Sequence, residues 1–279
     1  MPGIQVVGSY VACSGPALVV TLTDGPGSMR LRLAAALGER ETDGERISTV
    51  AVRLGRRDDA EPAAEALQWL ADHGRRGILR TRVPLGEVLV DEARKLGTTV
   101  MLELAHPDAG RQVALAGPGA ASVSSLLLHA QYLREVGLEV GGELGPLMPV
   151  VHDDDHDIKM LVRHAAAADL RDVHLSVGRL SRPRYDALAQ VLSTAELRAL
   201  LVAYGVDPLR FDEEPGLLAR VRRLPPVPHA SLYHRVRRFA EDAGLRVDAC
   251  GCPAQCHLDP ETARAFVPVA SGDLFADAG

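Results

Sequence analysis

Short runs of apolar and β-branched residues alternate along the chain with longer segments in which apolar residues recur at a helical spacing. Such runs predict buried strands, and a spacing of about 3.6 residues predicts amphipathic helices. The predicted strands are Ala17–Thr23, Ile47–Leu54, Gly77–Arg82, Thr98–Leu104, Leu138–Leu144, Val173–Gly178 and Leu245–Cys250. The predicted helices include Ala60–His73, Ser122–Val136, Asp155–Ala168 and Ser231–Ala243.

This alternation of strand and helix predicts an α/β fold with a parallel sheet and helices outside it. No GxGxxG follows the first strand, so a partial or full (β/α) TIM-like barrel is favoured over a dinucleotide-binding fold. We expect residues 1–279 to form a single barrel domain. The segment 193–228 breaks the alternation and ends in Pro225-Pro226-Val227-Pro228, which predicts a helical, proline-rich insertion before the last βα unit.

The amino-acid composition limits the kinds of binding partner and the cellular location that we expect for this protein. The chain is 47% hydrophobic, as expected for a globular core, and its formal net charge is −6, which does not indicate nucleic acid or an anionic membrane surface. No apolar run reaches the ~18–20 residues of a membrane helix, and the N-terminus lacks the pattern of a signal peptide. We therefore expect a cytoplasmic protein whose four cysteines are free, metal-bound or catalytic rather than paired.

Charged residues and one cysteine stand at the carboxyl ends of the predicted strands, where ligands bind in parallel α/β folds. They are Asp24, Arg53, Arg80, Arg82, Glu103, Glu143 and Cys250. Charges in otherwise apolar strands are costly to bury unless they are paired. Two interpretations remain open: internal ion pairs that close the barrel mouth, or a site for a small polar ligand formed by Arg80, Arg82, Glu103 and Glu143.

The densest group of metal-binding side chains is Cys250-Gly251-Cys252-Pro253-Ala254-Gln255-Cys256-His257. Three cysteines there could hold an iron–sulfur cluster with one open iron, and with His257 they could hold a closed tetrahedral zinc. Gly251 and Pro253 would bend the chain so that the thiols converge. The alternative is a set of small, partly buried thiols that bind no metal.

A second acidic and histidine-rich run, His152-Asp153-Asp154-Asp155-His156-Asp157, precedes a predicted helix. It could bind a divalent cation. We prefer the interpretation that its carboxylates cap the helix, because acidic residues satisfy the free N–H groups of the first turn.

Two glycine- and proline-containing segments, 24–28 and 117–119, are expected to be loops, since neither completes a phosphate-binding motif.

The order of several segments is similar to that of a known family. Thr81-Arg82-Val83-Pro84-Leu85 precedes a helical pattern, and Leu133-Arg134-Glu135-Val136-Gly137 ends a later one. Pro146-Leu147-Met148-Pro149 with Asp153 follows the next strand. Taken together over Leu54–Leu180, these segments resemble the spore photoproduct lyase-like branch of the radical S-adenosylmethionine superfamily, which implies a (β/α) barrel.

That family places CxxxCxxC after its first strand, where three thiolates hold a [4Fe–4S] cluster whose open iron binds S-adenosylmethionine. The corresponding segment here, Thr23-Asp24-Gly25-Pro26-Gly27-Ser28, contains no cysteine, and Cys13 stands alone upstream. The resemblance therefore implies the fold but argues against the family's use of S-adenosylmethionine.

Three functional hypotheses follow from the sequence. The first is a radical-SAM-like barrel that keeps a metal or iron–sulfur site at Cys250, Cys252, Cys256 and His257 and binds a small polar ligand at its mouth. The second is a catalytically inactive barrel that acts as a binding or assembly subunit for a protein partner. The third is a radical enzyme whose cluster has moved to the C-terminal cysteines.

Overall fold

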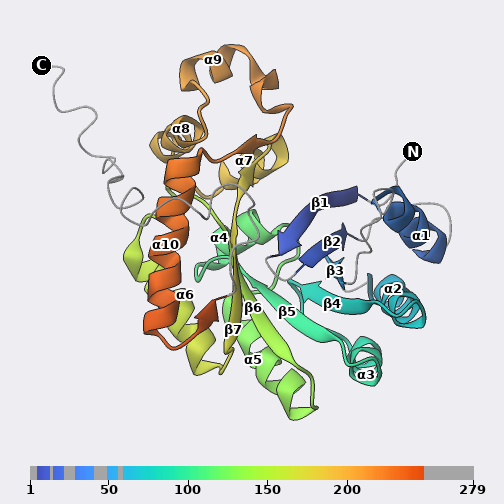
Figure 1. Cartoon of the computed structure of the whole chain (residues 1–279). Helices are drawn as coiled ribbons and strands as arrows, with labels where there is room; N and C mark the ends of the chain where they lie inside the picture. The colour runs from blue at the N-terminus through green and yellow to red at the C-terminus, as the bar shows by residue number, and fades with distance from the viewer. Residues whose placement is uncertain (1–4, 13–14, 22–28, 41–48, 56–58, 248–279) are drawn as a thin grey trace, which may run out of the picture.

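The computed structural model describes residues 5–12, 15–21, 29–40, 49–55 and 59–247. In this part of the chain one curved sheet has the strand order β1-β2-β3-β4-β5-β6-β7-β10, with helices packed outside it (Figure 1). The strands are β1 (Gln5–Ala12), β2 (Gly15–Thr21), β3 (Thr49–Leu54), β4 (Arg76–Thr81), β5 (Thr99–Leu104), β6 (Val140–Leu147), β7 (Asp172–Val177), β8 (Arg179–Leu180), β9 (Arg222–Arg223) and β10 (Arg246–Val247). From β2 to β7 and on to β10, each strand runs parallel to its neighbour, which confirms the predicted α/β barrel-like fold.

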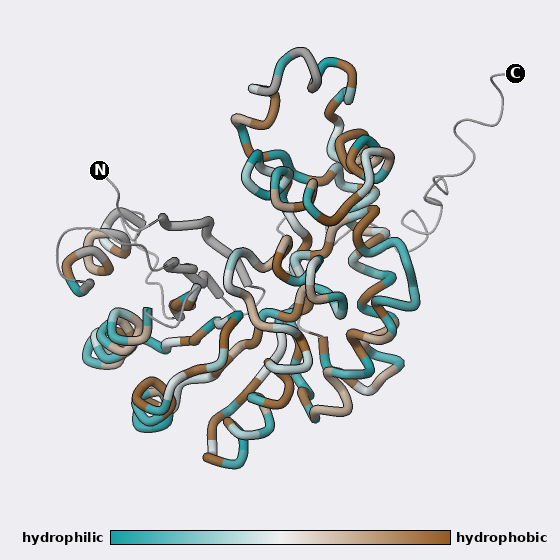
Figure 2. Tube along the Cα trace, turned by 180° about the vertical axis from the view of Figure 1, so that it is seen from behind, coloured by the Kyte–Doolittle hydropathy of each residue, from teal (hydrophilic) through white to brown (hydrophobic). Residues whose placement is uncertain are grey.

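Helices follow most of the parallel strands. They are α1 (Met29–Arg40), α2 (Ala60–Asp72), α3 (Glu87–Lys95), α4 (Ala109–Ala116), α5 (Val123–Glu135), α6 (Asp155–Ala167), α7 (Arg182–Leu188), α8 (Thr194–Ala203), α9 (Pro208–Glu213), the 3₁₀ helix η2 (Pro215–Leu218) and α10 (Pro226–Asp242). Seen from behind, hydrophobic and hydrophilic residues alternate along the outer helices (Figure 2), as expected for helices with one buried face. Among the described residues, no helix combines the length and apolar character needed to cross a membrane.

The two faces of the sheet differ in chemistry because successive side chains of a strand point to opposite sides. One face carries fully buried apolar side chains that pack under the helices: Val50, Val52, Leu79, Val100, Leu102, Leu104, Leu144, Val173 and Leu175. Helix α2 lies so close to this face that a Cβ on Gly77 would stand 2.7 Å from Leu67 Cδ2. The opposite side, which we call the inner face, carries the charged residues of the strands.

The structure adds an N-terminal strand that the sequence pattern did not indicate. β1 pairs with β2 in an antiparallel hairpin, and the register shifts between Val6 and Ser9. Gly8 and Ser9 interrupt the apolar run there. Because the strand signal is a continuous or strictly alternating apolar pattern, such an irregular strand escapes it.

Helix starts follow local signals. Ser122 accepts a hydrogen bond from the Ser125 N–H at 3.2 Å, and Asp154 accepts one from the His156 N–H at 2.7 Å. The predicted capping of α6 by the acidic run is thus confirmed at Asp154, and Ser122 caps α5 where the predicted helix begins. Helix α10 begins at Pro226 rather than at the expected Ser231, because a proline in the first turn has no N–H to lose and suits the helical φ.

Between β7 and α10 the chain leaves the sheet. It forms the two-stranded β8–β9 ribbon and the helices α7, α8, α9 and η2, which lie above α4 and α6 in Figure 1. A capping box at Ser193 and Glu196 begins α8. This excursion contains most of the expected 193–228 insertion; that all of 1–279 forms a single domain stays a prediction.

Candidate functional site

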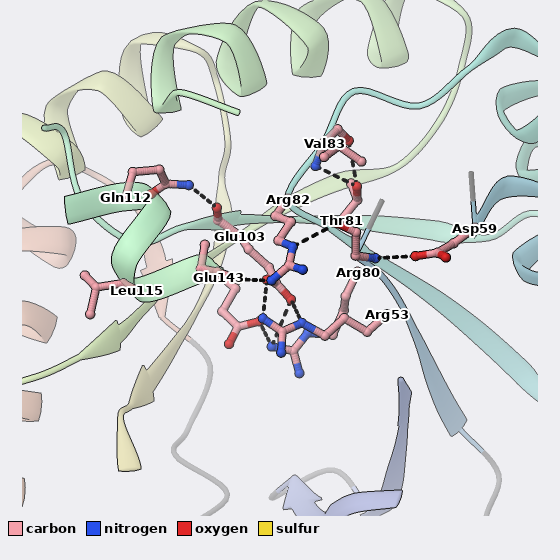
Figure 3. Close-up of polar contacts among 12 residues, drawn as sticks. Arg53, Asp59, Arg80, Thr81, Arg82, Val83, Glu103, Gln112, Leu115 and Glu143 are labelled. Atoms are coloured by element: carbon pink, nitrogen blue, oxygen red, sulfur yellow. Dashed lines mark hydrogen bonds and ion pairs between the residues drawn. The ribbon is translucent and has the colours of Figure 1, made fainter. Parts of the chain in front are cut away.

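Four charged side chains meet on the inner face near the carboxyl ends of neighbouring strands (Figure 3). Arg53 of β3 and Arg80 of β4 are register partners, and so are Glu103 of β5 and Glu143 of β6. Partners in register lie on the same face and about 4.8 Å apart along the hydrogen-bonding direction. We call these four residues the paired-charge cluster; its opposite charges come from strands that are distant in sequence.

The pairing within the cluster is specific. Arg53 donates from Nε and Nη2 to the two carboxylate oxygens of Glu103, each at 2.6 Å. Arg80 donates from Nη2 to Glu143 and also lies 3.9 Å from Glu103 Oε1. A bidentate guanidinium–carboxylate pair is both strong and directional. The cluster carries two positive and two negative charges and is neutral as a whole.

The electrostatic setting keeps Glu103 ionised. Its side chain is only 3% exposed, and burial alone raises the pKa of a carboxyl group. The positive charges of Arg53 and Arg80, together with the hydrogen bond from Arg53, outweigh burial and hold the pKa of Glu103 below its ordinary value. The Arg53 side chain is 27% exposed, so the cluster reaches solvent through its arginine side.

Arg82, the remaining predicted ligand residue, is placed differently. Its Nε donates to the Gly55 carbonyl at 3.0 Å, and its Nη1 donates to the Ala116 carbonyl. The space beside this guanidinium has no room for a Cβ on Gly117, whose φ of 108° also suits glycine. Arg82 therefore ties the end of β3 to the end of α4, while its charge adds to the lowering of the Glu103 pKa.

A buried glutamine braces the strand that carries Glu103. Gln112 of α4 is fully buried and accepts hydrogen bonds from the N–H groups of Ala105 and His106 at 2.8 and 2.9 Å. It donates to the Glu103 carbonyl at 3.1 Å, as Figure 3 shows. The turn after β5 is thus held by one side chain whose polar atoms are satisfied, as buried polar groups require.

Two buried histidines stand behind this turn. His152 accepts from the Met148 N–H through Nδ1 at 3.0 Å and pairs with the Ala105 carbonyl through Nε2 at 2.8 Å, which makes Nε2 the protonated nitrogen. Burial lowers the pKa of His152 to about 4, so its ring is neutral at neutral pH. His106 lies 3.4 Å from Asp157 Oδ2; burial also lowers its pKa, although the Asp157 charge acts in the opposite direction.

The acidic run 152–157 is dispersed by the fold. His152 points into the turn after β5, Asp154 caps α6, and Asp157 faces both His106 and Arg111, the latter at 3.6 Å. No group of three or more histidine, cysteine, aspartate or glutamate side chains within the described residues is arranged to hold a metal ion. The hydrogen bond that Asp154 accepts from the His156 N–H supports the capping interpretation for that residue.

Other sequence candidates lie outside the described residues. Asp24 and the loop 24–28 belong to this group, as do Cys250, Cys252, Cys256 and His257. The segment 117–119 is a loop between α4 and α5, as predicted. The metal-binding prediction for the cysteines stays a prediction.

The sequence placed Arg80, Glu103 and Glu143 in one site, and the structure brings them together. It did not assign Arg53 to that site, although Arg53 was noted as a strand-end charge; its position opposite Arg80 in register is the signal that identifies it. Gln112 and His106 were not identified from the sequence, and His152 was considered only as part of the acidic run 152–157. A polar residue within the apolar pattern of α4 is the signal that marks Gln112.

Comparisons with known proteins bear on the fold. No protein-family model matches the chain, and no match is found among curated proteins. Among solved structures, a spore photoproduct lyase variant with bound AdoMet and dinucleoside spore photoproduct matches with a TM-score of 0.50 and 16% identity, over 86% of this chain and 72% of that one.

Two further structures give weaker matches. Another variant of the lyase has a TM-score of 0.48 and 16% identity, over 79% of this chain and 66% of that one. SuiB of Streptococcus suis bound to its precursor peptide SuiA has a TM-score of 0.47 and 13% identity, over 77% of this chain and 46% of SuiB. This chain thus spans less than half the length of SuiB. At these identities the fold alone is shown: the α/β partial barrel of this chain is similar in structure to that of the radical SAM enzyme spore photoproduct lyase.

Proposed function

We propose that this barrel binds a small polar ligand with an α-amino carboxylate group at the paired-charge cluster. The observation that carries the proposal is the neutral set of two arginines and two glutamates at the carboxyl ends of adjacent strands. The carboxyl end of a parallel sheet is where ligands bind in this class of fold. The arginine side of the cluster reaches solvent.

The chemistry of the cluster suits a ligand that carries both signs of charge. A ligand carboxylate can accept hydrogen bonds from Arg53 and Arg80, since guanidinium groups match carboxylates in shape and charge. A ligand ammonium group can donate to Glu143 or Glu103. A ligand that is neutral overall leaves the cluster neutral, so that no uncompensated charge is buried on binding.

A binding or assembly role without a small ligand is the alternative. It draws support from the same ion pairs, because Arg53–Glu103 and Arg80–Glu143 neutralise one another inside the fold. The two functions differ in one observable. A ligand site gains stability when a zwitterionic ligand is added, whereas a purely internal set of ion pairs does not.

The test uses the neutral free amino acids and S-adenosylmethionine, which carries the same α-amino carboxylate group beside a cationic sulfonium, as probes in thermal unfolding. At a concentration near a hundredfold Kd, a bound ligand raises the Tm by about 5 °C. We expect at least one probe to do so, and the shift to disappear in Glu143→Gln. Glu241→Gln, which removes an exposed helical partner of Arg237, is the matched control and should keep the shift. A panel in which no probe shifts the wild-type Tm contradicts the proposal.

The iron–sulfur cofactor of the radical SAM family does not fit this chain at its usual place. β2 ends at Thr21 and α1 begins at Met29, and the residues between them contain no cysteine. We therefore derive no radical step for the chain. Protein reconstituted with iron and sulfide, then incubated with S-adenosylmethionine and reductant, should form no 5′-deoxyadenosine by chromatography.

The cysteine group at 250–257 supports a second candidate, a metal site, on the sequence alone. Three cysteines and His257 within eight positions provide the soft donors that zinc or an iron–sulfur cluster prefers. Metal analysis after anaerobic purification is the test. We expect about one equivalent of zinc, or iron together with sulfide, and its loss in Cys252→Ser/Cys256→Ser. Wild-type protein without metal would remove this candidate.

A further inference from the structure

The β8–β9 ribbon presents two arginines directly opposite each other. In this antiparallel pair Arg179 is the register partner of Arg223, and both side chains are exposed. Side chains at opposed positions of an antiparallel pair lie on the same face, with Cβ atoms about 4.5–5.5 Å apart. Like charges in this arrangement destabilise a ribbon unless a counter-charge is present.

No carboxylate among the residues that the structure describes pairs with Arg179, Arg220 or Arg223. Nearby carboxylates serve other arginines: Asp186 pairs with Arg182 at 2.8 Å, and Glu214 lies 3.6 Å from Arg210. Two more arginines of the ribbon region add positive charge, and each donates to a backbone carbonyl, Arg184 to Arg179 and Arg222 to Leu217.

Contacts with buried parts of the fold hold the β8–β9 ribbon in place. Leu180, opposite Arg222, is fully buried, and the Gly178 carbonyl that precedes the ribbon accepts a hydrogen bond from Tyr204 Oη at 2.8 Å. The Gly178 N–H donates to the Leu147 carbonyl at 2.7 Å. These contacts fix the backbone that carries the two opposed arginines. A fixed backbone lowers the entropy that is lost when both guanidinium groups bind one ligand.

We propose that Arg179 and Arg223 form an anion site for the phosphate group of a small phosphate monoester. Two guanidinium groups that extend from opposed positions can both reach the oxygens of one phosphate, and a group with a charge of about −1.5 to −2 at neutral pH neutralises both. Arg220 and Arg222 raise the local positive potential. The carboxylates of Asp186 and Glu214 in the same region, and the chain's net charge of −6, favour a single phosphate over a long polyanion.

One residue, Gly178, separates the end of β7 from the start of β8, so the ribbon stands at the same end of the sheet as the paired-charge cluster. The phosphate site does not depend on the function proposed for that cluster, because the two sets of residues are different. Its test can therefore fail or succeed independently.

The experiment titrates the full chain with inorganic phosphate and with ribose 5-phosphate at constant ionic strength, and follows binding by calorimetry and by the shift in Tm. Saturable binding is expected for wild type. In Arg179→Gln/Arg223→Gln it should weaken by about tenfold or more, because two charge-assisted hydrogen-bond donors are lost. The double variant removes a repulsion, so it should fold with an unchanged or higher Tm in the absence of phosphate.

Arg94→Gln/Arg163→Gln is the matched control: it removes the same charge from exposed positions of α3 and α6 and should bind both probes as wild type does. Sulfate and a single-stranded oligonucleotide are the competing probes. The proposal is overturned if neither phosphate probe binds, if the control variant weakens binding as much as the ribbon variant, or if only the oligonucleotide binds.

Discussion

Two pairs of arginines face each other across neighbouring strands of this protein, and the fold treats them differently. Arg53 and Arg80 are register partners inside the main sheet, and each has a glutamate within hydrogen-bonding distance. Arg179 and Arg223 are register partners in the β8–β9 ribbon, and no described carboxylate pairs with them. The same local arrangement is neutralised in one place and left positive in the other.

Burial accounts for the difference. An ionised group removed from water needs a partner, since the loss of hydration is larger than most single interactions can offset. Glu103 and Glu143, both nearly fully buried, supply the charge that Arg53 and Arg80 require. The ribbon arginines stay hydrated, so their mutual repulsion is weak. Their positive charge therefore remains available to bind a ligand.

A third arrangement lies between these two. Arg82, Arg134 and Arg235 each donate to backbone carbonyls of other segments: Gly55 and Ala116, Ala168 and Asp169, and His152, respectively. The planar guanidinium, with five donors, can bridge two carbonyls in a way that lysine cannot. These arginines join segments of the fold and are expected to matter for stability rather than for binding.

The largest effect is expected at the centre of the buried pair. Glu103→Gln keeps the shape of the side chain but removes the charge that neutralises Arg53, and should lower the free energy of unfolding by about 3 kcal/mol, towards the low end for a broken buried pair because Arg53 is partly exposed. Urea unfolding followed by circular dichroism measures it. Glu241→Gln, at an exposed helical pair, should cost at most about 0.5 kcal/mol. Equal losses in the two variants would mean that burial does not distinguish them.

Arg82→Gln should have the next largest effect. It removes the donors to the Gly55 and Ala116 carbonyls, and a lost partner of a buried acceptor costs about 1–3 kcal/mol. Arg182→Gln, whose exposed pair with Asp186 lies within one helix, is the control and should change stability by at most about 0.5 kcal/mol. If Arg82→Lys restored full stability, the bridging role assigned to the planar guanidinium would be wrong.

The stability loss expected for Glu103→Gln should depend on pH. The pKa of Glu103 is below its ordinary value of 4.5 in the folded protein, because Arg53 and Arg80 outweigh burial. Its contribution to stability is therefore fully present above the unfolded pKa and is lost as the pH falls through the folded one. The stability gap between wild type and Glu103→Gln should narrow below about pH 4.5. A gap that stays constant to pH 3 would indicate that the Glu103 charge is not its source.

The smallest effect is expected at the ribbon. Without added phosphate, Arg179→Gln/Arg223→Gln should leave the free energy of unfolding within about 0.5 kcal/mol of wild type, with any change towards greater stability. Raising the salt concentration to about 1 M, where the Debye length is near 3 Å, should abolish this difference. A clear loss of stability at low salt would show that these arginines have a structural partner, and the comparison with Arg53 and Arg80 would fail.

Part of the candidate site could be predicted from residue order. Glutamates at the ends of Leu-rich strands are unusual enough to mark Glu103 and Glu143, and the parallel topology places strand ends on one edge. Their partners could not be assigned in the same way. Arg53 lies 50 residues before Glu103, and Arg80 lies 63 residues before Glu143, so each pairing depends on strand order and register. The same reason explains why the contacts of Arg82 with the Gly55 and Ala116 carbonyls could not be predicted; its part in a ligand site stays a prediction.

The sequence by itself determined the local elements: the strands at β3, β5 and β7 to within two residues, and the capped starts of α5 and α6 at Ser122 and Asp154. These signals involve residues at most a few positions apart, and backbone preferences and side-chain caps act at that range. Only the tertiary structure decided which charges neutralise one another, because the energy of a buried charge depends on groups that folding brings near and on the water that it removes. The two opposed arginine pairs show this limit. Nothing in the sequence distinguishes the arginines of one pair from those of the other, and the difference between the pairs lies in how deeply the fold buries them.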